Sequence, residues 1–187
     1  MKDKIRVKTT KKKGASYSAK DCAYIAVFVA LVIAAQFVLS AVPGVELVTV
    51  LFVAYAFSFG AARGMIAATA FSLLRQIVFG IYPTVLILYL IYYNGLAAIF
   101  GMLGKNCKAS KKQLFKVVLS ACVCTVCFTL LDNVITPLWN GYSEKAAVLY
   151  FKYSLPVMIP QILCTAITVS FLFLPLCKAF SLWKPNV

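Results

Sequence analysis

Residues 22–42 read CAYIAVFVALVIAAQFVLSAV, a run of twenty-one residues that contains no charged side chain. A helix needs roughly 20 predominantly apolar residues to cross the hydrocarbon core of a bilayer, so this stretch predicts a transmembrane helix. The run ends at Pro43 and Gly44, a pair that commonly closes a helix. The rest of the fold must therefore be compatible with lipid.

The remainder of the sequence has the same character, because 63% of all 187 residues are hydrophobic. Soluble domains are nearer about 45–50% apolar, and a chain of this size could not bury such an excess. Five further apolar runs follow, over residues 46–59, 64–79, 83–103, 113–135 and 147–176. They do not alternate in polarity, and all exceed the roughly 9–11 residues of a barrel strand. We predict an all-α bundle of six transmembrane helices over residues 19–187, preceded by a disordered cytoplasmic tail over residues 1–18.

Two of the predicted helices are unusual. The second, over residues 46–59, is short for a span, and we expect neighbouring helices to bury its ends. The sixth contains Pro156 and Pro160, which should kink it or divide it into a short interfacial piece and a span.

Basic residues predict the orientation of the bundle. The chain has 19 Lys and Arg against 5 Asp and Glu, and eight of the bases fall within the first twenty residues. With the N-terminus inside, sixteen of the nineteen bases lie on the cytoplasmic side, including those of a basic loop over residues 104–112. The positive-inside rule thus predicts that both termini are cytoplasmic. The same distribution favours contact with lipid head groups over nucleic acid.

The sequence lacks residues that several classes of enzyme require. There is no histidine, no G-x-x-x-x-G-K-[ST] phosphate loop and no G-x-S-x-G elbow. The seven cysteines fall mostly in apolar runs, where a thiol acts as a small hydrophobic group. We expect no enzyme activity, no metal, no cofactor and no direct use of ATP.

Polar residues gather toward the predicted outer side of the bundle, where they suggest a ligand site. An ionisable group within a membrane is costly and commonly marks a ligand or a pathway. The candidate substrate-binding residues are Glu46, Arg75, Gln76, Tyr89, Asn94, Asp132, Asn133, Lys152 and Gln161. Arg75 and Lys152 would suit a carboxylate or phosphate on the ligand. The alternative is internal ion pairing, with Arg75 bound to Glu46 or Asp132.

Small residues form a stripe on the first helix. Ala26, Ala30 and Ala34 follow one another at four-residue spacing and so share one face. In lipid, such a stripe lets another helix approach closely. It could serve packing within the bundle or the docking of a separate membrane subunit.

The chain resembles the substrate-binding S components of energy-coupling factor transporters, which take up vitamins in bacteria and archaea. The resemblance rests on six helices, both termini inside, the basic loop after the fourth helix, the alanine stripe and the PGVELVT stretch from Pro43 to Thr49. It implies a multi-pass protein of the cell membrane that binds a vitamin-like small molecule from outside. It also implies partners, namely a transmembrane coupling protein and two ATPase subunits. Ala26, Ala30 and Ala34 would then meet the coupling protein, and the loop from Pro43 to Glu46 would help to gate the site.

Two other functions are also compatible with the sequence. One is an intramembrane enzyme or lipid-handling protein in which Arg75, Asp132 and Asn133 act on an isoprenoid or phospholipid head group. It would require further acidic groups or a metal site facing one cavity. The other is a small assembly or scaffold subunit without a ligand.

Overall fold

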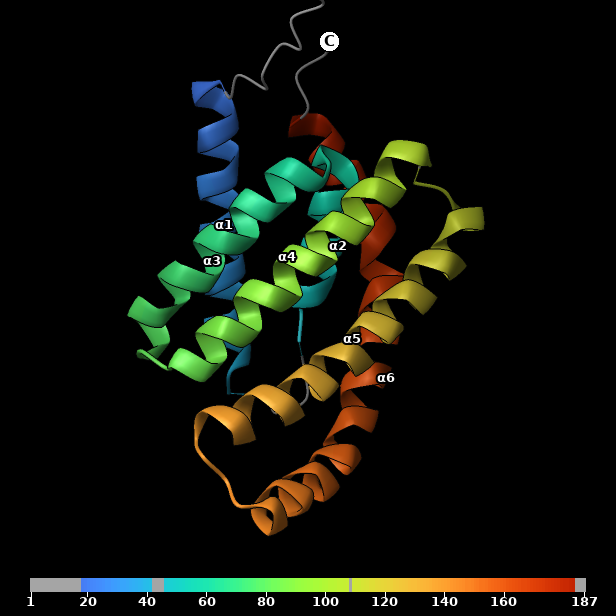
Figure 1. Cartoon of the computed structure of the whole chain (residues 1–187). Coiled ribbons are helices and arrows are strands. Elements are labelled where there is room, and N and C mark those ends of the chain that lie inside the picture. Colours follow the sequence, from blue (N-terminus) through green and yellow to red (C-terminus); the bar gives the residue numbers. More distant parts are fainter. Residues whose placement is uncertain (1–17, 42–45, 108, 184–187) are drawn as a thin grey trace, which may run out of the picture.

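A computed structural model describes residues 18–41, 46–107 and 109–183, and within these ranges the chain is helical and contains no strand (Figure 1). The helices are α1 (Ala19–Leu39), α2 (Val48–Phe59), α3 (Ala61–Phe79), α4 (Pro83–Asn106), α5 (Lys111–Trp139) and α6 (Glu144–Trp183). The predicted all-α class is confirmed for the described residues. Residues 1–17 of the predicted tail and residues 43–45 of the predicted gating loop lie outside them.

Four of the described helices, α1, α4, α5 and α6, are long and apolar enough to cross a membrane. The helix α2 is apolar but has only 12 residues. These helices indicate a membrane-embedded protein.

The first three helices begin two or three residues away from the predicted starts, and α1 also ends three residues earlier than predicted, at Leu39. The helix α1 begins at Ala19, because Asp21 accepts a 3.1 Å hydrogen bond from the backbone N–H of Ser18. Asp21 also forms a 3.0 Å salt bridge with Arg63 of α3. The predicted turn over residues 60–63 shrinks to Gly60 alone, whose φ of 89° ends α2 and starts α3 at once.

The last two helices extend beyond the predicted runs. The helix α5 continues through Pro137 to Trp139, so the predicted loop over residues 136–145 is reduced to residues 140–143. The helix α6 is a single 40-residue helix, although Pro156 and Pro160 lie within it. The expectation that these prolines divide it is therefore wrong. Figure 1 shows the helix changing direction in its lower part, as expected where proline removes a backbone donor.

The centre of the bundle is α2, in which all ten residues from Val48 to Phe57 are buried. At 1.5 Å per residue the helix is only about 18 Å long, against about 30 Å for the hydrocarbon core. It contacts α1, α3, α4 and α6, which shield its backbone from lipid. This agrees with the expectation that neighbours bury the short second helix.

Aromatic rings pack between α2 and the helices around it. Phe28 of α1 stacks on Tyr55 with ring centres 3.9 Å apart. Phe52 lies 5.3 Å from Phe71 of α3 and 4.8 Å from Tyr93 of α4. These five rings join four helices, and all are buried.

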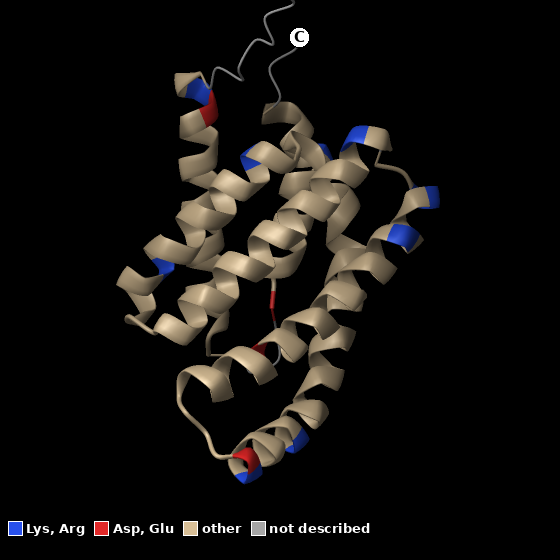
Figure 2. Cartoon of the chain, viewed as in Figure 1, with Lys and Arg blue, Asp and Glu red and all other residues tan. Residues whose placement is uncertain are grey.

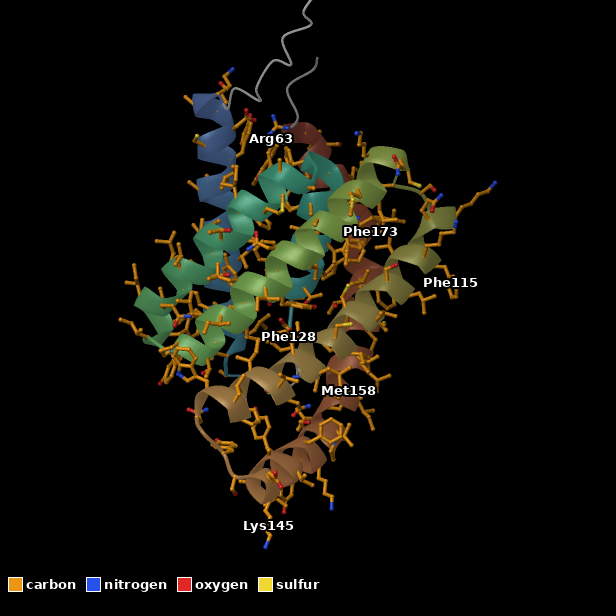
Figure 3. The ribbon with its side chains drawn as sticks, in the orientation of Figure 1. Arg63, Phe115, Phe128, Lys145, Met158 and Phe173 are labelled. Carbon is orange, nitrogen blue, oxygen red and sulfur yellow. The ribbon has the colours of Figure 1, made fainter. Side chains whose placement is uncertain are left out.

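The two ends of the bundle carry different charge. The first end is where α1 begins and α6 ends, and α4 also meets α5 there; we call it the termini end (Figure 1). Most of the described bases gather at this end, whereas few lie in the other half (Figure 2). The opposite end carries the turn from α5 to α6, with Lys145 at its tip (Figure 3).

Close approach of α4 to the α2–α3 junction requires glycine. A Cβ on Gly101 would collide with the backbone nitrogen of Ala61, and one on Gly104 would collide with the carbonyl oxygen of Phe57. At Gly95 of the same helix, by contrast, a Cβ would meet nothing within 4 Å. Glycine thus sets how tightly α4 can pack at the termini end.

We expect Gly101→Ala to lower the stability of the purified protein by roughly 1–3 kcal/mol, because the backbone must move to admit a methyl group. Gly95→Ala is the matched control and should be neutral or slightly stabilising, since alanine favours helix by up to about 1 kcal/mol. Thermal unfolding in the same detergent compares the two. Equal melting temperatures for both variants would contradict the close packing of α4.

Candidate functional site

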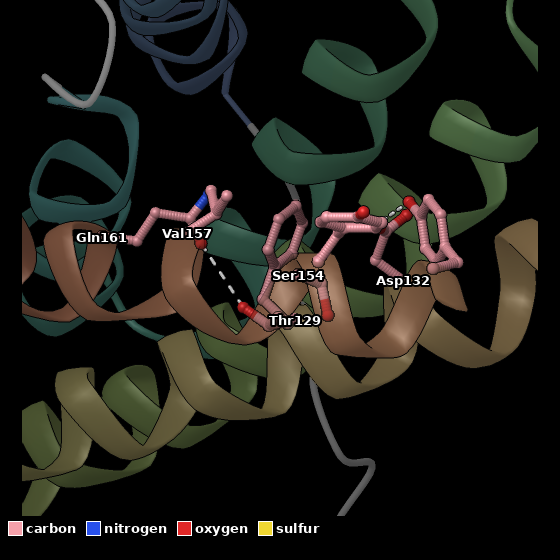
Figure 4. A pocket seen from close by; sticks show the side chains of 8 residues that line it. Thr129, Asp132, Ser154, Val157 and Gln161 are labelled. Atoms are coloured by element: carbon pink, nitrogen blue, oxygen red, sulfur yellow. Dashed lines mark hydrogen bonds between the residues drawn. The ribbon is translucent and has the colours of Figure 1, made fainter. Parts of the chain in front are cut away.

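A cavity of about 260 Å³ lies between α5 and α6 in the half of the bundle away from the termini end (Figure 4). It is lined by aromatic and polar side chains, namely Phe128, Thr129, Asp132, Tyr150, Tyr153, Ser154, Val157 and Gln161. This volume is slightly below the about 300–1,000 Å³ of typical ligand pockets, so the cavity would take only a ligand smaller than most.

Helical spacing places these residues on facing stripes. On α5, Thr129 and Asp132 are three residues apart. On α6, Tyr150, Ser154 and Gln161 are separated by four and seven residues. Residues at these intervals share one face of a helix, so each helix contributes one wall of the cavity.

Asp132 is the charged group of the cavity. Its two carboxylate oxygens accept hydrogen bonds from the hydroxyls of Thr136, at 2.7 Å, and Tyr150, at 2.6 Å. Distances of about 2.5–2.7 Å are typical of hydroxyl donors to an ionised carboxylate. The two bonds fix the carboxylate in orientation, and the Tyr150 bond ties α5 to α6.

Gln161 and Thr129 close the other end of the cavity. The Thr129 hydroxyl donates a 3.3 Å hydrogen bond to the side-chain oxygen of Gln161 (Figure 4). Phe128 extends the lining toward α4, because its ring lies 4.7 Å from that of Tyr92 and 6.1 Å from that of Tyr89. The lining of the cavity thus contacts the aromatic residues of α4 through Phe128.

Glu46 lies just before α2, near the cavity but outside its lining. Its carboxylate accepts hydrogen bonds from Tyr93, at 3.1 Å, and from Thr49, at 3.4 Å. Its backbone N–H meets the sulfur of Cys164 at 3.3 Å. A carboxylate at this position also suits the positive end of the α2 dipole, so Glu46 has a structural role at the start of the core helix.

Arg75 belongs to a separate cluster formed by α1, α3 and α4. Its Nε donates a 3.1 Å hydrogen bond to Gln36, which in turn donates one of 3.2 Å to the Tyr89 hydroxyl. The guanidinium carbon lies 4.7 Å from the ring centres of both Phe79 and Tyr89. Arg75 forms no salt bridge with Glu46 or Asp132, although one of its terminal nitrogens is buried without a partner in the described structure.

Gln76 and Asn94 hold the helix pair α3–α4 together. The side-chain oxygen of Gln76 accepts a 2.9 Å hydrogen bond from the backbone of Tyr82, in the turn between these helices. Asn94 accepts a bond from Thr69 of α3 and donates one to the backbone of its own helix. These contacts are structural, and neither residue lines the cavity.

Asn133 and Lys152 also lie outside the cavity lining. The amide of Asn133 is buried, and neither of its polar atoms has a hydrogen-bond partner within the described residues. Lys152 is exposed and lines a surface hollow with Glu144 and Lys145. Of the nine residues suggested by the sequence, the structure brings Asp132 and Gln161 together at one cavity.

Most of the lining residues were not among those predicted from the sequence, although their spacing carries a signal. Thr125, Thr129, Asp132 and Thr136 recur every three or four residues along α5, and three of them are threonines with no charge to draw attention. A polar stripe at helical spacing within an apolar helix indicates a face turned away from lipid. The depth of single polar residues was a weaker guide than this periodicity.

The alanine stripe of α1 faces outward. Ala26, Ala30 and Ala34 are all exposed, whereas Gly64 and Ala68 of α3 are buried against neighbouring helices. The stripe on α1 is therefore not used for packing within the described bundle.

Comparisons with protein-family models, curated proteins and solved structures found no match.

We expect the Arg75 cluster to support the fold rather than the cavity. Gln36→Leu and Arg75→Met should each destabilise the protein by roughly 1–3 kcal/mol, because each strands the partner's polar group. The double variant should cost less than the sum, by about 0.5–3 kcal/mol. Unfolding free energies in one detergent test this, with Gln113→Leu at the first turn of α5 as the control. Simple additivity would show that the two side chains do not interact.

Proposed function

We propose that this chain is the substrate-binding S component of an energy-coupling factor transporter in a bacterial or archaeal cell membrane. It crosses the membrane six times with both termini in the cytoplasm. It captures a vitamin-like small molecule at the extracellular side. A transmembrane coupling protein and two ATPase subunits then drive release of the ligand inside.

The observation that carries this proposal is the position of the α5–α6 cavity. The positive-inside rule assigns the basic termini end to the cytoplasm. The cavity lies in the opposite half of the bundle. A partly enclosed cavity with aromatic walls and a few converging polar groups suits a small metabolite. Its position supports loading from outside.

The exposed alanine stripe supports the need for a partner. Ala26, Ala30 and Ala34 leave a smooth strip along α1, and the described helices do not cover it. Small residues allow the close helix contacts on which association in lipid depends. Because the sequence has no phosphate-binding loop, ATP hydrolysis in this proposal is assigned to the two ATPase subunits.

The enzyme alternative receives less support from the same site. Asp132 is the only acidic residue in the cavity lining, and Arg75 and Asn133 lie outside it. The three residues proposed to act together on a lipid head group do not share a cavity.

We expect the protein purified in mild detergent to retain a small water-soluble molecule, detectable by mass spectrometry after denaturation. Uptake of that molecule into cells should require co-expression of the coupling protein and both ATPases. Accumulation that is equally strong without the ATPases would contradict the proposal. Recovery of phospholipid as the only specific ligand would favour a lipid-handling function instead.

We expect Ala30→Trp to prevent copurification of the coupling protein while leaving ligand binding unchanged, because a large ring blocks close helix approach. Val123→Trp is the matched control, since Val123 is an exposed residue of α5 and lies far from the stripe in sequence. Pull-down with tagged coupling protein reads out the association. Normal recovery of the complex with Ala30→Trp would remove the docking role from α1.

A further inference from the structure

We propose that the ligand of the α5–α6 cavity is a small organic cation whose charged nitrogen binds against Asp132. This inference rests on the function proposed above, because it names the chemical class that the same site would take. It departs from the expectation of a carboxylate or phosphate ligand, which the sequence suggested from Arg75 and Lys152.

The charge of the lining residues favours a cationic ligand. Asp132 is the single charged residue among the eight that line the cavity, and none of the eight is basic. An anionic ligand would therefore meet a carboxylate without a compensating base.

The two basic residues that the sequence suggested for binding an anion do not line the cavity. Arg75 lies over the rings of Phe79 and Tyr89 and is bound to Gln36. Lys152 lines a different hollow, beside Glu144. Neither faces the cavity.

The carboxylate of Asp132 retains capacity for a ligand. An ionised carboxylate offers about four acceptor positions, and the hydroxyls of Thr136 and Tyr150 use two of them. Hydroxyl donors orient the carboxylate without neutralising it. Asp132 is half-buried, and a carboxylate attracts a positive charge more strongly than a neutral molecule, so binding a cation gains more here than binding a neutral ligand.

The walls favour the same class of ligand. Phe128, Tyr150 and Tyr153 contribute three aromatic rings to the lining that contains the carboxylate. Ring faces attract cations, and the attraction grows when water is excluded. Thr129, Ser154 and Gln161 add polar groups that could receive the N–H donors of an amine.

Glu46 does not compete with Asp132 for the ligand. Its backbone contacts Cys164, which is three residues after Gln161 on α6 and thus about one turn from the cavity lining. Its carboxyl group is held by Tyr93 and Thr49, and within the described residues it forms no salt bridge.

Three probes of similar size and different charge test the proposal: tyramine, 4-ethylphenol and 4-hydroxyphenylacetate. We expect tyramine at millimolar concentration to raise the melting temperature of the protein in detergent, 4-ethylphenol to do so weakly, and the anion not at all. Asp132→Asn keeps the size and hydrogen-bonding capacity of the side chain and removes its charge. It should weaken tyramine binding roughly 10- to 150-fold and abolish the preference for the cation.

Glu144→Gln is the matched control, because Glu144 is an exposed acid on α6 outside the cavity, and it should leave the preference unchanged. The proposal is overturned if the anion binds as well as the amine, if tyramine gives no response, or if Asp132→Asn retains the preference. These outcomes are separate from those for the transport role. A cation preference without any coupling-protein complex would remove the S-component function alone, and ATP-dependent uptake of an anion would remove the cation inference alone.

Discussion

The structure depends on burying a helix that is too short to cross a membrane. The backbone groups at both ends of α2 would face hydrocarbon if the helix stood alone, and each such group without a partner costs several kcal/mol. The surrounding helices α1, α3, α4 and α6 enclose α2 and separate its ends from lipid. The tight junction at Gly60 and the glycine contacts of α4 are consequences of the same need, because they bring the neighbours close to its C-terminal end.

The short α2 also explains why a cavity exists. The contact between Glu46 and Cys164 places the beginning of α2 beside the middle of α6. The cavity residues of α6, from Tyr150 to Gln161, all lie on the far side of that contact. Within the described residues α2 begins at Val48 and does not continue along this part of α5 and α6, so it does not fill the space between their facing polar and aromatic side chains. The core helix thus ends where the candidate site begins.

Much of the fold follows from the sequence because lipid imposes simple rules. The all-α class and the order of the helices came from the length and composition of the runs, and the structure agrees within the described residues, where four of the helices are long and apolar enough to cross a membrane. Helix ends were less predictable. A capping carboxylate at Asp21 started α1 early, and the prolines of α5 and α6 were accommodated without ending either helix. Apolar content measures compatibility with lipid, whereas helix ends depend on local hydrogen bonds.

The candidate site was only partly predictable, because depth in the membrane does not fix the direction of a side chain. Arg75 and Asp132 were grouped by similar depth, yet Arg75 turns toward rings of α3 and α4 while Asp132 turns toward α6. The difference arises from partners distant in sequence. Tyr89 and Gln36 hold the arginine, and Tyr150 holds the aspartate.

This division of charge has a physical consequence for the whole molecule. If Arg75 faced Asp132, the two would neutralise each other and the cavity would have no net charge. Because Arg75 is held by Gln36 and by the rings of Phe79 and Tyr89, the positive and negative charges each keep a separate environment. In the cation-binding site that we propose, Asp132 would select the ligand by charge, and the cluster around Arg75 would stabilise the bundle without taking part in that selection.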